Sequence, residues 1–235
     1  MSEAVIRDPA KFDNFNAFFT RALVPGARPI DASVGAVVCP ADGAISELGR
    51  IDEGRILQAK GKHYTVTELL TDKESNRFIG GSFATVYLSP RDYHRVHMPL
   101  TGRLLRTIYV PGKLFSVNRL TADSVPGLFA RNERLVCLFE TDQGLMAVVL
   151  VGAMIVAGIQ TVWEGQVCPG PLKSRLLTDY AGTAPPVELA KGAELGRFCL
   201  GSTAIVLFES DAVQLDPSLQ THSSVRMGQL LAQST

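Results

Sequence analysis

The first regular pattern along the chain is a stripe of aromatic and aliphatic side chains between residues 9 and 23. Its members recur at spacings of three and four: Phe12, Phe15, Phe19 and Leu23. This spacing places them on one face of a helix, so we predict an amphipathic helix over residues 9–23 that Pro25-Gly26 ends. Such a stripe packs against a core or lies on a lipid surface, and the sequence leaves both uses open.

From residue 34 onwards the pattern changes to short apolar runs bounded by Gly, Pro and Asp. We predict strands over residues 34–39, 44–48, 55–59, 83–88, 102–109, 134–140, 145–151, 155–164 and 203–208. One short helix is predicted over Val66–Leu70, after Thr65. This spacing of elements indicates a mainly β (α+β) fold, in which antiparallel sheets pack face to face beside the amino-terminal helix and a few short helices.

Two longer stretches need separate interpretation. Residues 144–162 form the longest uncharged run, but glycines interrupt it and its β-branched residues favour one or two buried strands over a spanning helix. Residues 168–190 are rich in Pro and Gly, which predicts a mobile surface loop. Too little chain follows this loop to build a second core, so we predict a single domain over residues 1–235.

Composition and charge narrow the class of protein. Of the 235 residues, 46% are hydrophobic, which is ample for a buried core. The 23 Lys and Arg balance the 23 Asp and Glu, so no strong field favours nucleic acid as a partner. Residues 1–8 lack the apolar core of a signal peptide. We expect most of the chain to lie in the cytoplasm, with any membrane contact peripheral.

Three polar stretches contain candidate catalytic side chains. Asp42 lies in a Pro-Ala-Asp-Gly turn, where it serves the turn or an active site. His94 and His97 follow a predicted strand, and an acid–base or orienting role suits them better than metal binding, because Pro90 and Pro99 bracket the segment and disfavour the helix on which this spacing binds a metal. Ser202 follows Gly201 at the head of a strand. Because neither histidine is assigned to metal binding, we predict no metal site.

Asp42, His97 and Ser202 are the three residue types of an activated serine. The acid orients the imidazole, and the imidazole removes the hydroxyl proton. Three functions use or tolerate this set. They are cleavage of the chain's own peptide bond at Ser202, hydrolysis of external esters by a serine hydrolase, and a non-catalytic β-sheet carrier. The hydrolase is disfavoured because the chain has no Gly-x-Ser-x-Gly motif.

Seven segments together resemble the bacterial phosphatidylserine decarboxylase family, in the family's order and from about Phe12 to Phe208. They are Phe15-Asn-Ala-Phe-Phe-Thr-Arg21, Pro40-Ala-Asp-Gly43, Gln58-Ala-Lys-Gly61, Tyr87-Leu-Ser-Pro-Arg-Asp-Tyr-His-Arg-Val-His-Met-Pro99, Tyr109-Val-Pro-Gly112, Leu128-Phe-Ala-Arg-Asn-Glu-Arg134 and Leu200-Gly-Ser-Thr203. The histidine segment and the Leu-Gly-Ser-Thr signature are the most specific of these.

The resemblance implies a self-processing proenzyme. Asp42, His97 and Ser202 would act as the relay that cuts the chain between Gly201 and Ser202. The products would be a large β subunit, residues 1–201, and a small α subunit, residues 202–235, held as a heterodimer. Ser202 would become a covalent pyruvoyl group, which forms a Schiff base with the substrate amine and accepts electrons as carbon dioxide departs. His94 would then serve the decarboxylation step, or be a structural histidine.

The resemblance also implies a substrate and a location. The substrate would be phosphatidylserine and the product phosphatidylethanolamine, so the enzyme would be peripheral on the cytoplasmic side of the cell membrane. Four basic side chains are candidates to meet the lipid phosphate: Arg91, Arg95, Lys113 and Arg131. A homodimer of the heterodimers is left open.

Overall fold

A computed structural model describes residues 1–154, 158–168, 174–199 and 202–235. The fold is mainly β, with 42% of residues in strands and 13% in helices, and its sheets are antiparallel, so the predicted class is confirmed. Several predicted features lie wholly or partly outside the described residues. They are Leu200 and Gly201 of the predicted cleavage signature, residues 155–157 of a predicted strand and residues 169–173 of the predicted loop.

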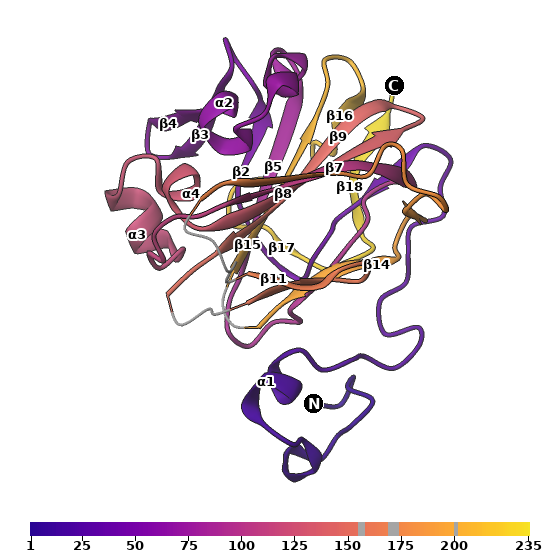
Figure 1. Ribbon diagram of the computed structural model, residues 1–235. Coiled ribbons are helices and arrows are strands. Elements are labelled where there is room, and N and C mark those ends of the chain that lie inside the picture. The colour runs from indigo at the N-terminus through magenta and orange to yellow at the C-terminus, as the bar shows by residue number, and fades with distance from the viewer. Residues whose placement is uncertain (155–157, 169–173, 200–201) are drawn as a thin grey trace.

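A nine-stranded sheet runs through the centre of the molecule (Figure 1). Its strand order is β12-β7-β8-β9-β15-β5-β2-β17, and β13 also pairs with β7. The strands are β2 (Gly43–Arg50), β5 (Ser82–Leu88), β7 (Gly102–Val110), β8 (Arg134–Thr141), β9 (Gly144–Gly152), β12 (Leu176–Asp179), β13 (Glu188–Leu189), β15 (Ser202–Phe208) and β17 (Ser224–Val225). β15 is therefore an inner strand, bonded on both sides.

Three smaller sheets complete the β structure. The four-stranded sheet has the order β11-β10-β14-β6, the three-stranded sheet has the order β1-β18-β16, and β3 and β4 form a hairpin. Their strands are β1 (Ala36–Val38), β3 (Arg55–Ala59), β4 (Lys62–Thr65), β6 (Arg95–His97), β10 (Ile159–Thr161), β11 (Gly165–Cys168), β14 (Glu194–Phe198), β16 (Val213–Leu215) and β18 (Leu230–Ser234). All their pairings are antiparallel.

Alternate side chains of β15 enter two separate cores, one on each face of the large sheet. Ala204, Val206 and Phe208 belong to the core shared with the three- and four-stranded sheets. Ile205 and Leu207 belong to the opposite core, which the β3–β4 hairpin and the helices after β4 and β7 cover. Because both faces are buried, β9 and β15 consist of nearly continuous apolar residues rather than alternating ones.

The helices are short. They are η1 (Pro9–Lys11), α1 (Phe15–Phe19), α2 (Val66–Leu70), η2 (Lys73–Phe78), α3 (Arg119–Ser124) and α4 (Leu128–Arg131). α2 begins and ends as predicted, because Thr65 and Glu68 form a capping box at its start. None of the helices in the described parts of the chain is long and apolar enough to cross a membrane.

The amino-terminal helix is shorter than the predicted range of residues 9–23. Phe12 is extended and Asn14 caps a new start by accepting a hydrogen bond from Ala17 N, so α1 covers only Phe15–Phe19. The aromatic stripe is divided between the core and the surface of the molecule. Phe19 is buried, whereas Phe15 is 60% exposed.

The predicted surface loop of residues 168–190 is more regular than expected. β12 pairs with residues 106–109 in the second half of β7, and β13 pairs with residues 102 and 103 at its start. A strand at the edge of a sheet has unpaired backbone groups that a neighbouring segment can bond. The partners of these short strands lie about 70 to 90 residues earlier, so local sequence carried no signal for them.

The described parts of three connections between the large sheet and the four-stranded sheet lie close together. They join β5 to β6, β9 to β10 and β14 to β15. Ser202 pairs with Leu88 on one side and Gly152 on the other. Across the same region Phe198 N donates to His94 O (3.0 Å) and Cys199 N donates to Gly158 O (2.8 Å). We call the described residues of 88–94, 152–158 and 198–202 the crossover corner.

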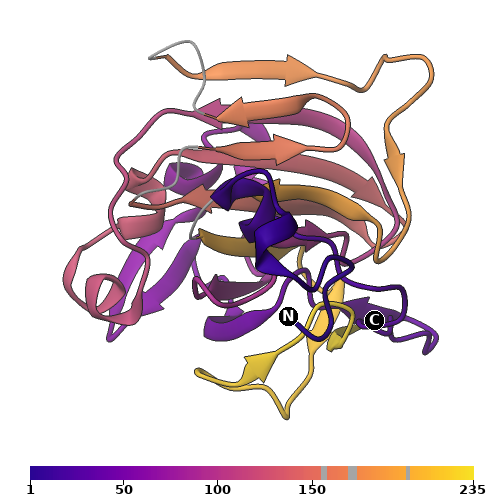
Figure 2. The same cartoon turned by 90° about the horizontal axis from the view of Figure 1, so that it is seen from below.

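The amino-terminal segment lies against this corner. In Figures 1 and 2, α1 stands outside the sheets, on the side of β14 and away from α2 and the β3–β4 hairpin. The Phe19 and His94 ring centroids are 3.9 Å apart, and Arg95 Nε donates to Thr20 O (2.9 Å). Phe19 of α1 therefore packs against His94, one of the residues that the sequence singled out as chemically important.

Candidate functional site

Ser202 begins the inner strand β15 and is fully buried. It alternates with Ala204 and Val206, which places its side chain on the face shared with the four-stranded sheet. No described group forms a hydrogen bond with Ser202 Oγ. A buried hydroxyl without a partner is costly, and such a group in a folded protein calls for an explanation. A serine that is consumed by its own chemistry supplies one.

His94 also lies in the crossover corner, and one of its ring nitrogens likewise has no hydrogen-bond partner among the described residues. Its Nδ1 is 2.9 Å from Asp92 O; since a carbonyl only accepts, Nδ1 carries the proton. Nε2 is buried without a hydrogen-bond partner among the described residues. Burial lowers the pKa of His94 to about 4, against weaker raising effects of Asp92. At neutral pH the ring is neutral, and Nε2 holds a free lone pair.

His97 uses both ring nitrogens. Nδ1 donates to Gly192 O (2.8 Å), and the Tyr93 hydroxyl lies 3.1 Å from Nε2, to which it donates when the ring is neutral. Burial is the main cause that lowers the pKa of His97, whereas the Gly192 carbonyl, Glu194 and Asp42 raise it. The neutral tautomer is therefore the one with its proton on Nδ1.

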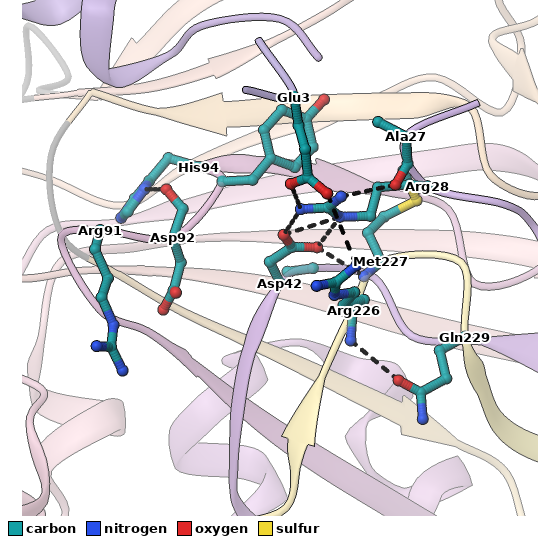
Figure 3. Close-up of polar contacts among 12 residues, drawn as sticks. Glu3, Ala27, Arg28, Asp42, Arg91, Asp92, His94, Arg226, Met227 and Gln229 are labelled. Carbon is teal, nitrogen blue, oxygen red and sulfur yellow. Dashed lines mark hydrogen bonds and ion pairs between the residues drawn. The ribbon is translucent and has the colours of Figure 1, made fainter. Parts of the chain in front are cut away.

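Asp42 is held by the amino-terminal segment. Arg28 Nε donates to both carboxylate oxygens (2.8 and 2.9 Å), Arg28 Nη2 donates to Oδ2 (2.5 Å) and Met227 N donates to Oδ1 (2.9 Å). Arg28 also forms an ion pair with Glu3 (3.0 Å). Figure 3 shows Arg28 between these two carboxylates. The Asp42 side chain is 10% exposed and that of Arg28 8%, so this is a buried ion pair.

The structure brings the main chain of His97 close to that of Asp42, whereas Ser202 pairs with Leu88 and Gly152. His97 N donates to Pro40 O (2.8 Å), which places its main chain two residues from Asp42. Among the described residues, however, no hydrogen bond links Asp42, His97 and Ser202 to each other. Catalytic hydrogen bonds are often long or absent in a resting state, so this geometry leaves the relay open to rearrangement.

Two participants in this arrangement were missed from the sequence. Tyr93 stands inside the histidine segment, but nothing in its local pattern indicates a bond to His97. Arg28 stands alone before Pro29, 14 residues from Asp42. Its only sequence signal is a single basic residue in an otherwise uncharged stretch between Leu23 and Ile30.

The predicted phosphate ligands have different surroundings. Arg95 is paired with Glu194 (2.7 Å), and Arg131 lies over the Phe115 ring. Arg91 is exposed and lines a cavity of about 300 Å³ together with Arg21, Arg28 and Arg226. This cavity also contains Asp42. Arg91 is therefore the predicted ligand best placed to meet an anion near the site.

The residues present fit a serine-derived pyruvoyl group. Conversion removes the Ser202 hydroxyl, which is one of several buried polar groups without a hydrogen-bond partner among the described residues. The new terminus would be held by the pairing of β15 with β5 and β9. No cluster of three or more His, Cys, Asp or Glu suited to a metal ion occurs in the described part of the chain.

Burial of His94 is expected to weaken the fold in mild acid. Its pKa is about 4 in the folded chain, against 6.5 for a free histidine. Between these values the unfolded chain binds more protons, so the free energy of unfolding decreases as the pH falls from 6.5 to 4. The complete difference amounts to roughly 3 kcal/mol. Urea unfolding of Ser202→Ala, which is expected to remain one chain, measures this slope.

In that background, His94→Gln should flatten the slope between pH 6.5 and 4, whatever it does to the stability at pH 7. The exposed His63 supplies the matched control, because His63→Gln should keep the slope of its parent. Equal slopes for the His94→Gln variant and its parent would contradict the assignment of a buried neutral ring.

Comparison with known proteins identifies the family of the chain. A family model described as phosphatidylserine decarboxylase matches residues 15–233. The phosphatidylserine decarboxylase proenzyme of Ectopseudomonas mendocina (strain ymp) is 62% identical over 234 residues, which cover 98% of this chain and 82% of the relative. Those of Pseudomonas putida (strain GB-1) and Azotobacter vinelandii (strain DJ / ATCC BAA-1303) are 59% and 58% identical, over 99% and 100% of this chain and 82% and 83% of the relatives. The chain therefore belongs to the phosphatidylserine decarboxylase family, which confirms the predicted resemblance.

Proposed function

We propose that Ser202, with His97 and Asp42, performs the self-cleavage that turns this phosphatidylserine decarboxylase proenzyme into a two-chain pyruvoyl enzyme. The observation that carries the proposal is the fully buried Ser202 hydroxyl at the start of the inner strand β15, which has no hydrogen-bond partner in the described part of the chain. The cut would fall between Gly201 and Ser202 and divide a single domain into residues 1–201 and 202–235.

The cleavage needs one nucleophile and one base. Ser202 Oγ attacks the Gly201 carbonyl carbon while His97 accepts the hydroxyl proton, and the Ser202 nitrogen leaves as an amine, which gives an ester. Loss of the Ser202 Cα proton then expels the Gly201 carboxylate and leaves dehydroalanine. Water hydrolyses its imine tautomer, releases ammonia and leaves the pyruvoyl group. For His97 to act, the Tyr93 hydroxyl must first give up Nε2.

In the mature enzyme, the ketone of the pyruvoyl group supplies a carbonyl for the substrate amine and accepts electrons from the departing carboxylate. The protein supplies position and protons. His94 is the residue we assign to proton transfer in decarboxylation, because its neutral Nε2 is buried in the crossover corner and has no hydrogen-bond partner among the residues described there. Asp92 O holds the tautomer that leaves Nε2 available.

We also propose that the enzyme works as a peripheral protein on the cytoplasmic side of the cell membrane. The exposed Phe15 and the half-buried Phe12 and Phe18 give α1 and its approach an apolar surface beside the site. An aromatic surface of this kind favours the interfacial region of a bilayer. The homodimer of heterodimers stays a prediction.

Mass spectrometry of freshly purified wild-type protein tests the cut. Under denaturing conditions we expect two fragments, and the smaller should begin at position 202 and be lighter than the serine-started peptide by one ammonia. Under native conditions the two should remain one complex, because β15 is bonded on both sides and β17 and β18 pair with β2 and β1. An intact chain, or one that reacts with a fluorophosphonate probe as a serine hydrolase does, would contradict the proposal.

A further inference from the structure

The Arg28–Asp42 pair is the most strongly bonded ionic contact beside the site. A guanidinium that gives two nitrogens to one carboxylate forms a directed, charge-assisted pair. Both side chains are at least nine-tenths buried. Taking two charges out of water is costly and is tolerated where the hydrogen bonding is complete, which here includes Met227 N and the Ala27 carbonyl.

The segment that carries Arg28 also touches the turn that holds His97. Ile30 packs against Gly192, whose carbonyl accepts the His97 Nδ1 proton, and against Gly228, next to the Met227 amide that binds Asp42. A Cβ at Gly192 would lie 2.8 Å from Ile30 Cδ1, and one at Gly228 would lie 2.5 Å from Pro29 O. Gly228 O accepts Asp31 N (2.8 Å), so residues 28–31 are bonded in place.

Asp42 acts on the histidine through space. Burial is the largest effect on the pKa of His97 and lowers it; the Asp42 charge raises this pKa, as the Gly192 carbonyl and Glu194 do more strongly. A negative charge at that place stabilises the imidazolium that forms when the ring accepts a proton. The side chain can do so only if it stays where it is, and the contacts that hold it are Arg28 and Met227 N.

We infer that Arg28 is a positioning residue for self-cleavage, which fixes the Asp42 carboxylate beside His97. This inference rests on the proposed function, because it concerns the same cut at Ser202. It adds a residue whose hydrogen bonds, within the described residues, go to Asp42, Glu3 and Ala27 and not to the nucleophile. Arg28 acts through Asp42, and both its charge and its forked shape matter to that role.

The test follows self-cleavage of newly synthesised chains by gel or mass spectrometry in wild type, Arg28→Met, Arg28→Lys and a matched control. Arg28→Met should slow cleavage at least about tenfold, the effect of one lost charge-assisted hydrogen bond. Arg28→Lys keeps the charge without the fork and should cleave at a rate between the two. Arg106 supplies the control, because it pairs with Asp72 in the core on the other face of the large sheet. Arg106→Met should cleave at the wild-type rate.

Each result has a defined meaning. If the wild type stays intact, the proposed function itself fails. If the wild type is cut and Arg28→Met is cut as fast or faster, the inference is overturned, as it is when Arg28→Lys is as slow as Arg28→Met or when Arg106→Met is equally slow. Melting temperatures are measured in parallel. Should Arg28→Met not fold, a folded Arg28→Lys that cleaves more slowly than the wild type supports the inference, and one that cleaves at the same rate overturns it.

Discussion

Ser202→Ala is expected to remain a single uncut chain and to have no decarboxylase activity above background. Alanine has no oxygen to attack the preceding carbonyl, and no pyruvoyl group can form from it. The fold should survive, because the change removes a buried hydroxyl that has no partner among the described residues. Denaturing gels, a carbon dioxide release assay and thermal melting measure the three consequences.

Two further variants make this result specific. Ser202→Cys keeps a nucleophile of similar size, so slow cleavage should persist. Thr203→Val removes the neighbouring hydroxyl, which is also buried and lies on the opposite face of β15. It should be processed normally. Cleavage of Ser202→Ala at the wild-type site would remove the serine from the mechanism.

Substitution of the two histidines is expected to separate processing from turnover. His97→Ala should slow self-cleavage by about 10²–10⁴-fold, the usual contribution of a general base. His94→Ala should be cut into two chains and yet lose decarboxylation by a similar factor, because the mature enzyme lacks its proton-transfer group. Time courses of cleavage and carbon dioxide release on the same preparations give both rates.

The structure would also explain a result in which cleavage depends on His94 and not on His97. His94 Nε2 has no hydrogen-bond partner within the described ranges of the chain, whereas His97 Nε2 lies 3.1 Å from the Tyr93 hydroxyl. If His94→Ala abolishes cleavage and His97→Ala does not, His94 is the base for Ser202 and the assignment from family resemblance is wrong. Tyr93→Phe serves as a control, since it frees Nε2 while keeping the ring and should not slow the cut.

Elements with complete local signals were predicted to the residue. α2 carries its capping box within four residues, and β3 covers the predicted Arg55–Ala59. Elements that depend on distant partners were missed, such as β6, which is bonded to β14 about 100 residues later. α1 was predicted too long, because the aromatic spacing begins before Asn14, whose side chain caps the actual start of the helix.

In the site, too, local motifs identified the residues but did not reveal their distant partners. Ser202, His94, His97 and Asp42 could be named because they stand in distinctive motifs. Their contacts could not be predicted: Asp42 is bonded to Met227, 185 residues away, and His97 to Gly192. Hydrogen-bond partners of this kind are set by how the sheets meet, which short-range patterns do not describe.

The place of Ser202 on an inner strand affects how long a single enzyme molecule can stay active. A prosthetic group made from the first residue of β15 is anchored by main-chain bonds to β5 and β9. It can be neither washed out by dialysis nor exchanged for a fresh one, as a freely dissociating coenzyme can. A molecule whose ketone is reduced to an alcohol therefore loses its activity for good, and the cell can replace it only by translating another copy.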